Sequence, residues 1–153
     1  MLLDVRTWTG GGLALTICAA MLGAAGCADP MRDLTGPSTD LAASFSSIRR
    51  EIFEATDAGR TACVTCHTPV GRAPAGDLNL VTDPYGSLVN AVSTGKRNML
   101  RVVPGNPEAS YLIHKLQGRS GIAGERMPFN GPPFLTSDEI YVVKRWIEIG
   151  APR

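Results

Sequence analysis

The fold depends on the stretch Cys63-Val64-Thr65-Cys66-His67, which brings two thiols and an imidazole together within one short segment. The whole chain has four cysteines and two histidines. Of the other cysteines, Cys18 lies in an N-terminal apolar run and Cys27 directly follows that run. The stretch therefore predicts one chemical site that uses both thiols and the adjoining histidine.

The spacing Cys-x-x-Cys-His is that of c-type haem attachment. Two thiols three positions apart on a helical turn reach the two vinyl groups on one edge of a porphyrin. The next residue then presents its imidazole to the iron from the same side. We therefore predict one covalent haem c, with thioethers at Cys63 and Cys66 and with His67 as an axial iron ligand.

Two other interpretations of this stretch are open. A thioredoxin-like redox pair needs a βαβ setting, and no strand-like alternation precedes Cys63. A zinc site needs a third and a fourth ligand, and the only other histidine is His114. Both alternatives fit the sequence less well than haem attachment does.

Residues 1–26 have the pattern of a secretory signal peptide, with Arg6 in a short head, an apolar run over 13–22 and a small-residue end. The apolar run is too short to span a bilayer comfortably. Cleavage of an ordinary signal after Ala25 or Ala28, or retention as an uncleaved anchor, are alternatives. Each of these interpretations implies that the domain is exported from the cytoplasm.

The signal ends in Ala24-Ala25-Gly26-Cys27, which resembles the bacterial lipobox. In that pattern the cysteine becomes the first residue and its thiol carries a diacylglycerol. The lipobox prefers leucine where this chain has Ala24. We expect a signal peptide over 1–26, lipidated Cys27 with a flexible tether over 27–40, and one folded domain over 41–153, lipid-anchored on the periplasmic side of a bacterial membrane.

Composition indicates a domain with little apolar core of its own. The formal net charge is +1, so nothing indicates a nucleic-acid partner. Aromatic residues make up 6% of the chain, against 17 glycines and 11 prolines. Long loops over 68–82 and 117–133 would need something to hold them, and a large apolar haem would serve.

Apolar periodicity predicts an all-α domain without convincing strands. Between the helices lie loops rich in glycine and proline. The last helix has the best signal, because Thr136 and Glu139 form a capping box. The predicted helical segments are 41–57, a short one over 63–67, 84–95, 106–118 and 136–150.

Residues 45 to 152 resemble the class I cytochrome c family, and in particular the single-haem cytochrome c-like domains of exported bacterial lipoproteins. The resemblance implies an all-α fold of about five short helices around one covalent haem. It also implies electron transfer to and from redox partner proteins. The matching pieces are Ile52-Phe53, the stretch 63–67, Gly76-Asp77-Leu78-Asn79-Leu80, the stretch 102–110, Arg126-Met127-Pro128 and the stretch 135–152.

The second axial ligand is predicted to be Met127. It lies in a stiff loop rich in glycine and proline, is followed by Pro128, and matches the family's ligand loop. A thioether is a soft ligand that raises the reduction potential. One alternative is Met99, whose surroundings are typical of a core methionine. The other is His114, which lies about 200° around the helix from Leu112. We therefore expect His114 to face solvent with Lys115 and Gln117.

A haem with two protein ligands favours an electron carrier rather than an enzyme. No second histidine is evident as a distal catalytic group. An enzyme subunit of peroxidase or oxidase type, or a gas-binding domain, would require that Met127 be displaceable. The side chains of Arg97, Arg101 and Arg126 could pair with haem propionates, or could be ordinary solvated charges.

Overall fold

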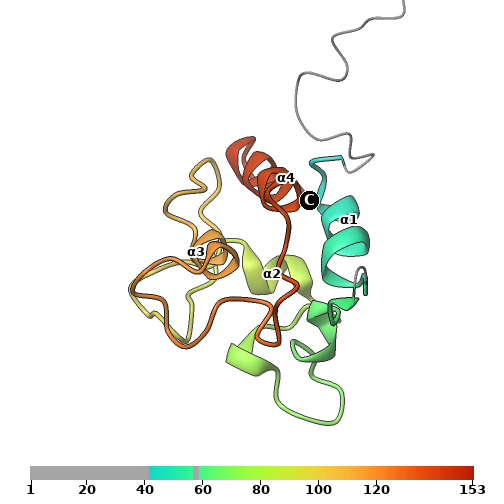
Figure 1. Cartoon of the computed structure of the whole chain (residues 1–153). Coiled ribbons are helices and arrows are strands. Elements are labelled where there is room, and N and C mark those ends of the chain that lie inside the picture. The colour runs from blue at the N-terminus through green and yellow to red at the C-terminus, as the bar shows by residue number, and fades with distance from the viewer. Residues whose placement is uncertain (1–41, 57–58) are drawn as a thin grey trace, which may run out of the picture.

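The computed structural model describes residues 42–56 and 59–153 (Figure 1). Within these residues the elements are helical and no β-strand forms, which confirms the all-α prediction. The expected signal peptide, Cys27 and the tether over 27–40 lie outside the described residues. Among the described residues, no helix has the length and apolar character needed to span a bilayer.

The first helical unit is continuous from α1 (Phe45–Ile48) into the π turn η2 (Arg49–Phe53). Ser44 is the N-cap, and its hydroxyl accepts a hydrogen bond from the Ser47 amide at 3.2 Å. Ile48 and Ile52 are fully buried, and Phe53 nearly so. The predicted apolar stripe over 41–57 is therefore confirmed in its described part.

The last helix, α4 (Ser137–Glu148), begins with the predicted capping box between Thr136 and Glu139. The ring of Trp146, on its buried face, lies 5.5 Å from the ring of Phe45 between centroids, so the first and last helices pack together. Helix α4 also contacts α3. The other buried residues of α4 are Ile140, Val142, Val143 and Ile147.

Helix α2 (Pro84–Leu88) begins at proline as predicted but ends well before Gly95. The backbone is extended instead, with isolated bridges from Val89 to Val102 and from Val92 to Leu100. The predicted helix over 84–95 was wrong in its second half because β-branched valines favour extended backbone. Here that backbone finds hydrogen-bond partners across the chain at 99–102.

Helix α3 (Tyr111–Gln117) ends at Gly118 as predicted, with the glycine in the left-handed region at φ 67°. It begins later than the predicted 106. The buried Ser110 hydroxyl accepts from the Val103 amide at 2.9 Å and donates to the Asn106 carbonyl at 2.8 Å. These bonds hold 103–110 as a turn, so the earlier start was wrong.

The stretch 63–67 forms only a 3₁₀ turn, η4 (Cys63–Thr65), rather than the expected short α-helix. A second turn of this kind, η5 (Ala75–Asp77), follows. The part of the chain that the structure describes thus has four α-helices, not about five. A core of 15 buried residues, which includes Ile48, Leu88, Ile113 and Trp146, joins these elements.

Candidate functional site

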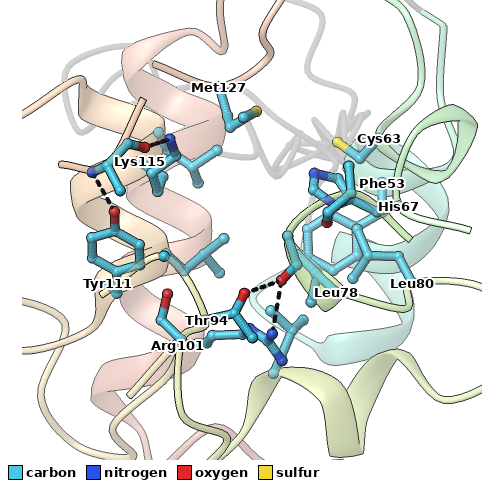
Figure 2. A pocket seen from close by; sticks show the side chains of 18 of the residues that line it. Phe53, Cys63, His67, Leu78, Leu80, Thr94, Arg101, Tyr111, Lys115 and Met127 are labelled. Carbon is cyan, nitrogen blue, oxygen red and sulfur yellow. Dashed lines mark hydrogen bonds between the residues drawn. The ribbon is translucent and has the colours of Figure 1, made fainter. Parts of the chain in front are cut away.

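A large cavity lies between the helices and the two long loops (Figure 2). It holds about 990 Å³ of empty space, including its open mouth. Its walls are mainly aliphatic and aromatic, with contributions from η2, η4, α2 and α3. The apolar lining includes Ile52, Phe53, Leu78, Leu80, Leu88, Leu112 and Leu116.

The thiol-imidazole stretch lies at one edge of this cavity. Cys63 and His67 line it, whereas Cys66 lies at the exposed surface beside them. Both cysteines are free thiols. Burial raises the pKa of the Cys63 thiol, and its Sγ donates a weak hydrogen bond to the Ile52 carbonyl at 3.7 Å. The protonated thiol is therefore the resting form of Cys63.

The imidazole of His67 is held in one orientation by a backbone carbonyl. Its Nδ1 lies 2.8 Å from the Ala75 oxygen, and a carbonyl can only accept, so Nδ1 carries the proton. Burial lowers the pKa of His67, and the charges of Arg101 and Lys115 lower it further. The ring is consequently neutral with an unprotonated Nε2, which is the form that ligates a metal ion.

Met127 lies on a different wall of the same cavity. Figure 2 shows its sulfur facing the space that Cys63 and His67 border. Its backbone N–H donates to the Lys115 carbonyl at 2.9 Å, which joins this loop to α3. The structure thus brings Met127 and His67, 60 positions apart in the sequence, to one cavity.

The two rival ligands lie elsewhere. Met99 is half-buried in the segment that pairs with 89–93, outside the cavity lining. His114 is also outside the lining, and its Nε2 lies 2.7 Å from the Glu108 carbonyl, to which it donates. Neither side chain shares the cavity with His67.

Two cations line the cavity. Arg101 is buried and donates to the carbonyls of Ser87, Gly76 and Asp77 at 2.8, 3.0 and 2.9 Å. Lys115 lines the wall near Met127, which corrects the expectation that it points to solvent with His114. Burial lowers the pKa of both groups. Among the lining residues that the structure describes there is no carboxylate, so the cavity favours an apolar occupant with negative charge.

The other two arginines considered from the sequence do not reach the cavity. Arg97 is exposed. Arg126 lies over the Phe134 ring, 4.1 Å from its centroid, and its Nε donates to the Leu116 carbonyl at 2.8 Å. Of the three, only Arg101 lies where an anionic group of an occupant would meet it.

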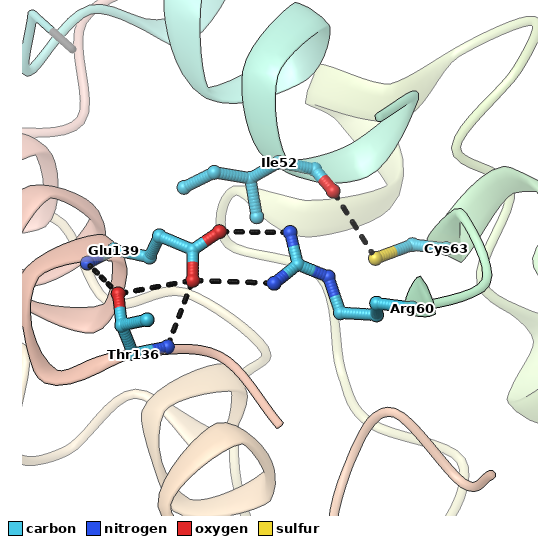
Figure 3. A network of polar contacts seen from close by, with 5 residues as sticks. All are labelled: Ile52, Arg60, Cys63, Thr136 and Glu139. Atoms are coloured by element: carbon cyan, nitrogen blue, oxygen red, sulfur yellow. Dashed lines mark hydrogen bonds and ion pairs between the residues drawn. The ribbon is translucent and has the colours of Figure 1, made fainter. Parts of the chain in front are cut away.

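A buried ion pair beside the thiols was not predicted from the sequence (Figure 3). Arg60 is 5% exposed, and its two terminal nitrogens lie 3.2 and 2.7 Å from the Glu139 carboxylate. Glu139 also accepts from the Thr136 amide. Burial alone would raise the pKa of Glu139, but the hydrogen bonds from Arg60 and Thr136 outweigh it and hold this pKa below its ordinary value. The pair fixes the segment before Cys63 to the start of α4.

No protein-family model, no curated protein and no solved structure matches this chain. Over residues 42–56 and 59–153, no three or more His, Cys, Asp or Glu side chains group so as to hold a metal ion.

Proposed function

We propose that this chain is a single-haem c-type cytochrome that carries electrons one at a time. The observation that carries the proposal is the shared cavity. It has the unprotonated Nε2 of His67 and a free thiol of the Cys-x-x-Cys-His stretch on one side, and the thioether of Met127 on another.

The character of the cavity fits haem as an occupant. A porphyrin is a large apolar plate with two carboxylates, and the walls are apolar with Arg101 and Lys115 as cations. One imidazole and one thioether hold a metal only if other donors complete its coordination. A macrocycle supplies four such donors, whereas a zinc site held by side chains needs more protein ligands.

The thiols have the state that covalent attachment requires. Cys63 and Cys66 are free rather than joined as a disulfide. Each would add its S–H across one vinyl group: the S–H bond and the C=C π bond would break, the sulfur would bond to one vinyl carbon and the hydrogen to the other, and no oxidant would be consumed. The Cys63 thiol is positioned for this at the cavity wall by η4 and by its bond to Ile52.

The axial residues have different tasks. The Nδ1–H bond of His67 to the Ala75 carbonyl fixes the ring orientation and increases the basicity of Nε2. The thioether of Met127 is neutral and soft, so it favours the reduced metal. A bound haem would supply the one-electron iron couple itself.

The lining favours a carrier over an enzyme. His67 is the one histidine among the lining residues of the described chain, and no lining carboxylate is available as a distal acid or base. If His67 and Met127 both hold a bound haem, no protein-facing position on its metal would be left open to substrate. On this basis we assign a class I cytochrome c-like arrangement, with short helices and loops around one haem.

The proposed location follows from residues 1–40. An exported, lipid-anchored domain places the cytochrome on the periplasmic side of a bacterial membrane, where it exchanges electrons with protein partners. In an oxidising compartment two neighbouring free cysteines would otherwise form a disulfide, and thioether bonds to haem would prevent this.

The experiment that tests the proposal is the optical spectrum of the full chain, expressed with a c-type maturation system. We expect a low-spin spectrum that changes reversibly on reduction and that CO does not alter. If the reduced form binds CO tightly, the protein is an enzyme subunit or a gas-binding domain rather than an electron carrier. Absence of any haem spectrum would overturn the proposal.

A further inference from the structure

The segment between Gly118 and Thr136 forms no helix or strand among the described residues, although it carries Met127. The backbone bonds of such a loop to other elements contribute to its position, together with its side-chain contacts. The question is which side chains hold Met127 toward the cavity.

Lys115 makes the largest share of these bonds. Its Nζ donates to the Ala123 carbonyl at 2.8 Å and also to the Glu125 carbonyl. Its own carbonyl accepts from the Met127 amide at 2.9 Å. One residue of α3 thus contacts the backbone of the loop at three places within five positions, the last of them at Met127 itself.

Tyr111, one turn earlier on α3, adds a fourth contact. Its buried hydroxyl accepts from the Ala123 amide at 2.7 Å. On the other side of Ala123, a Cβ at Gly95 would lie 3.3 Å from the Ala123 methyl group, so that approach is tight. Ala123 is exposed, but its backbone bonds to α3 and its methyl group lies close to Gly95.

The bonds of Lys115 differ from those of an ordinary surface lysine. A fully solvated lysine keeps its ammonium group in water, whereas this partly buried one lies at the cavity wall and donates to backbone carbonyls. Hydrogen bonds from a charged donor are stronger than neutral ones. The energy of these bonds therefore resists movement of the loop away from α3.

We propose that Lys115 is a positioning residue that fixes residues 123–127 against α3 and thereby keeps the Met127 thioether directed into the cavity. The inference rests on the proposed function, because it takes Met127 as the axial ligand. It adds that the strength of this ligation depends on an ammonium group that does not itself touch the metal.

The test compares Lys115→Met with the unaltered haem-loaded protein. Methionine keeps the length and apolar stem of lysine and removes the charged donor. We expect the haem to stay covalent, the weak far-red band of iron–sulfur ligation to fall, and the CO-accessible fraction of the reduced protein to rise on the order of tenfold or more. The far-red band and CO binding report ligation directly, so a general loss of stability does not imitate this result.

The matched control is Lys144→Met, which removes a lysine of α4 that pairs with Glu108 at the surface. This variant should keep the far-red band and its indifference to CO. Lys115→Arg, which retains a charged donor, should recover most of the band. If Lys115→Met does not accumulate, Tyr111→Phe removes the acceptor for the Ala123 amide and should shift the band in the same direction by a smaller amount.

Two results would overturn the inference. One is a Lys115→Met or Tyr111→Phe protein with an unchanged far-red band and unchanged CO binding. The other is loss of the low-spin spectrum in Lys115→Met together with its retention in Met127→Ala. Lys115 would then be a ligand itself. Failure of the proposed function is distinguishable from both, since it would show as absence of covalent haem in the unaltered protein.

Discussion

His67 and Met127 approach the cavity from separate segments and have different chemistry. The neutral imidazole is a borderline base held rigidly by the Ala75 carbonyl. The thioether has no second polar atom that could form an orienting hydrogen bond, as Nδ1 of His67 does. The orientation of Met127 therefore depends on its loop. Substitution at Met127 should therefore change the metal's properties without detaching the haem.

Met127→Ala is predicted to remove the far-red band, lower the reduction potential and allow CO or cyanide to bind. The physical reason is that the soft thioether favours the reduced iron and occupies the sixth position. The measurements are the optical spectrum, a redox titration and ligand titration of the haem-loaded variant.

Met99→Ala and His114→Ala are the controls, because both side chains lie outside the cavity lining. Their spectra should match that of the unaltered protein. A change to high spin in His114→Ala, with none in Met127→Ala, would mean that the ligands are two histidines.

Site residues were predictable from the sequence where their signal lies in one short segment. They were missed where the signal depends on residues far apart in the chain. Cys63, Cys66 and His67 form a contiguous motif, and Pro128 marks its neighbour Met127. Arg60 and Glu139 are 79 positions apart, so nothing in the sequence near either one indicates the pair. The helical angle of Lys115 predicted that its side chain faces solvent. That prediction was wrong because a helical angle places the Cα and not the end of a long side chain.

At the scale of elements, a largely buried ion pair links the segment before Cys63 to helix α4. Arg60 and Glu139 form it, and Arg60 Nε has no hydrogen-bond partner among the described residues. The side chain of Arg60 is 4% exposed and that of Glu139 is 16% exposed. Removing the carboxylate would therefore leave the more buried charge unpaired.

Glu139→Gln is predicted to lower the free energy of unfolding by about 3–5 kcal/mol, because it leaves a buried guanidinium without a counter-charge. Arg60→Met should cost less, about 1–3 kcal/mol, because Glu139 keeps its bonds to Thr136 and some contact with water. Urea unfolding of the haem-loaded variants measures both. Equal costs would contradict the asymmetry.

The same pair predicts a pH dependence. The pKa of Glu139 in the folded protein lies below its ordinary value of 4.5. The ion pair therefore contributes its full stability above about pH 4.5, and this contribution is lost as pH falls through the lower folded value. Glu139→Gln should lack this part of the acid destabilisation, which unfolding curves between neutral and acid pH would show.

Helices were predictable where a local signal and the packing agreed. The capping box starts α4, Pro84 starts α2 and Gly118 ends α3, as expected. The exceptions are 89–95 and 106–110, where bonds to distant backbone and to the buried Ser110 hydroxyl replaced helical ones. Such long-range partners are not visible in a pattern of local propensities.

At the scale of the whole molecule, the cavity accounts for the shortage of aromatic core. The cavity has mainly apolar walls and about 990 Å³ of empty space, including its open mouth, and the loops over 68–82 and 117–133 border it. A chain of this size buries a limited fraction of its surface without an added group. The fold and the attached group should therefore depend on each other.

Cys66→Ala or His67→Ala is predicted to reduce the yield of soluble folded protein several-fold, because weaker haem attachment removes the apolar area that binds only the native state. Circular dichroism and soluble yield measure this. Cys18→Ala, in the expected signal peptide, is the control and should not affect folding. A cooperatively folding apoprotein with native helix content would contradict the prediction.

The anchor prediction belongs to the same scale. If the proposal holds, Cys27→Ser should release the protein into the soluble periplasmic fraction with the proposed haem still attached, because a diacyl chain supplies the buried methylene groups that stable membrane attachment needs. Fractionation followed by haem staining measures it. Finding the unaltered protein soluble and without lipid would show that Cys27 is not the anchor.

The central claim is that haem is joined to the polypeptide through Cys63 and Cys66, and covalent retention tests it most directly. The full chain is expressed with a c-type maturation system, denatured, separated on a gel and stained for haem, and its mass is measured in parallel. The account predicts a stained band and a mass increased by one haem, with no haem extracted by acidified organic solvent. Complete extraction of the haem, with the polypeptide mass unchanged, would contradict it.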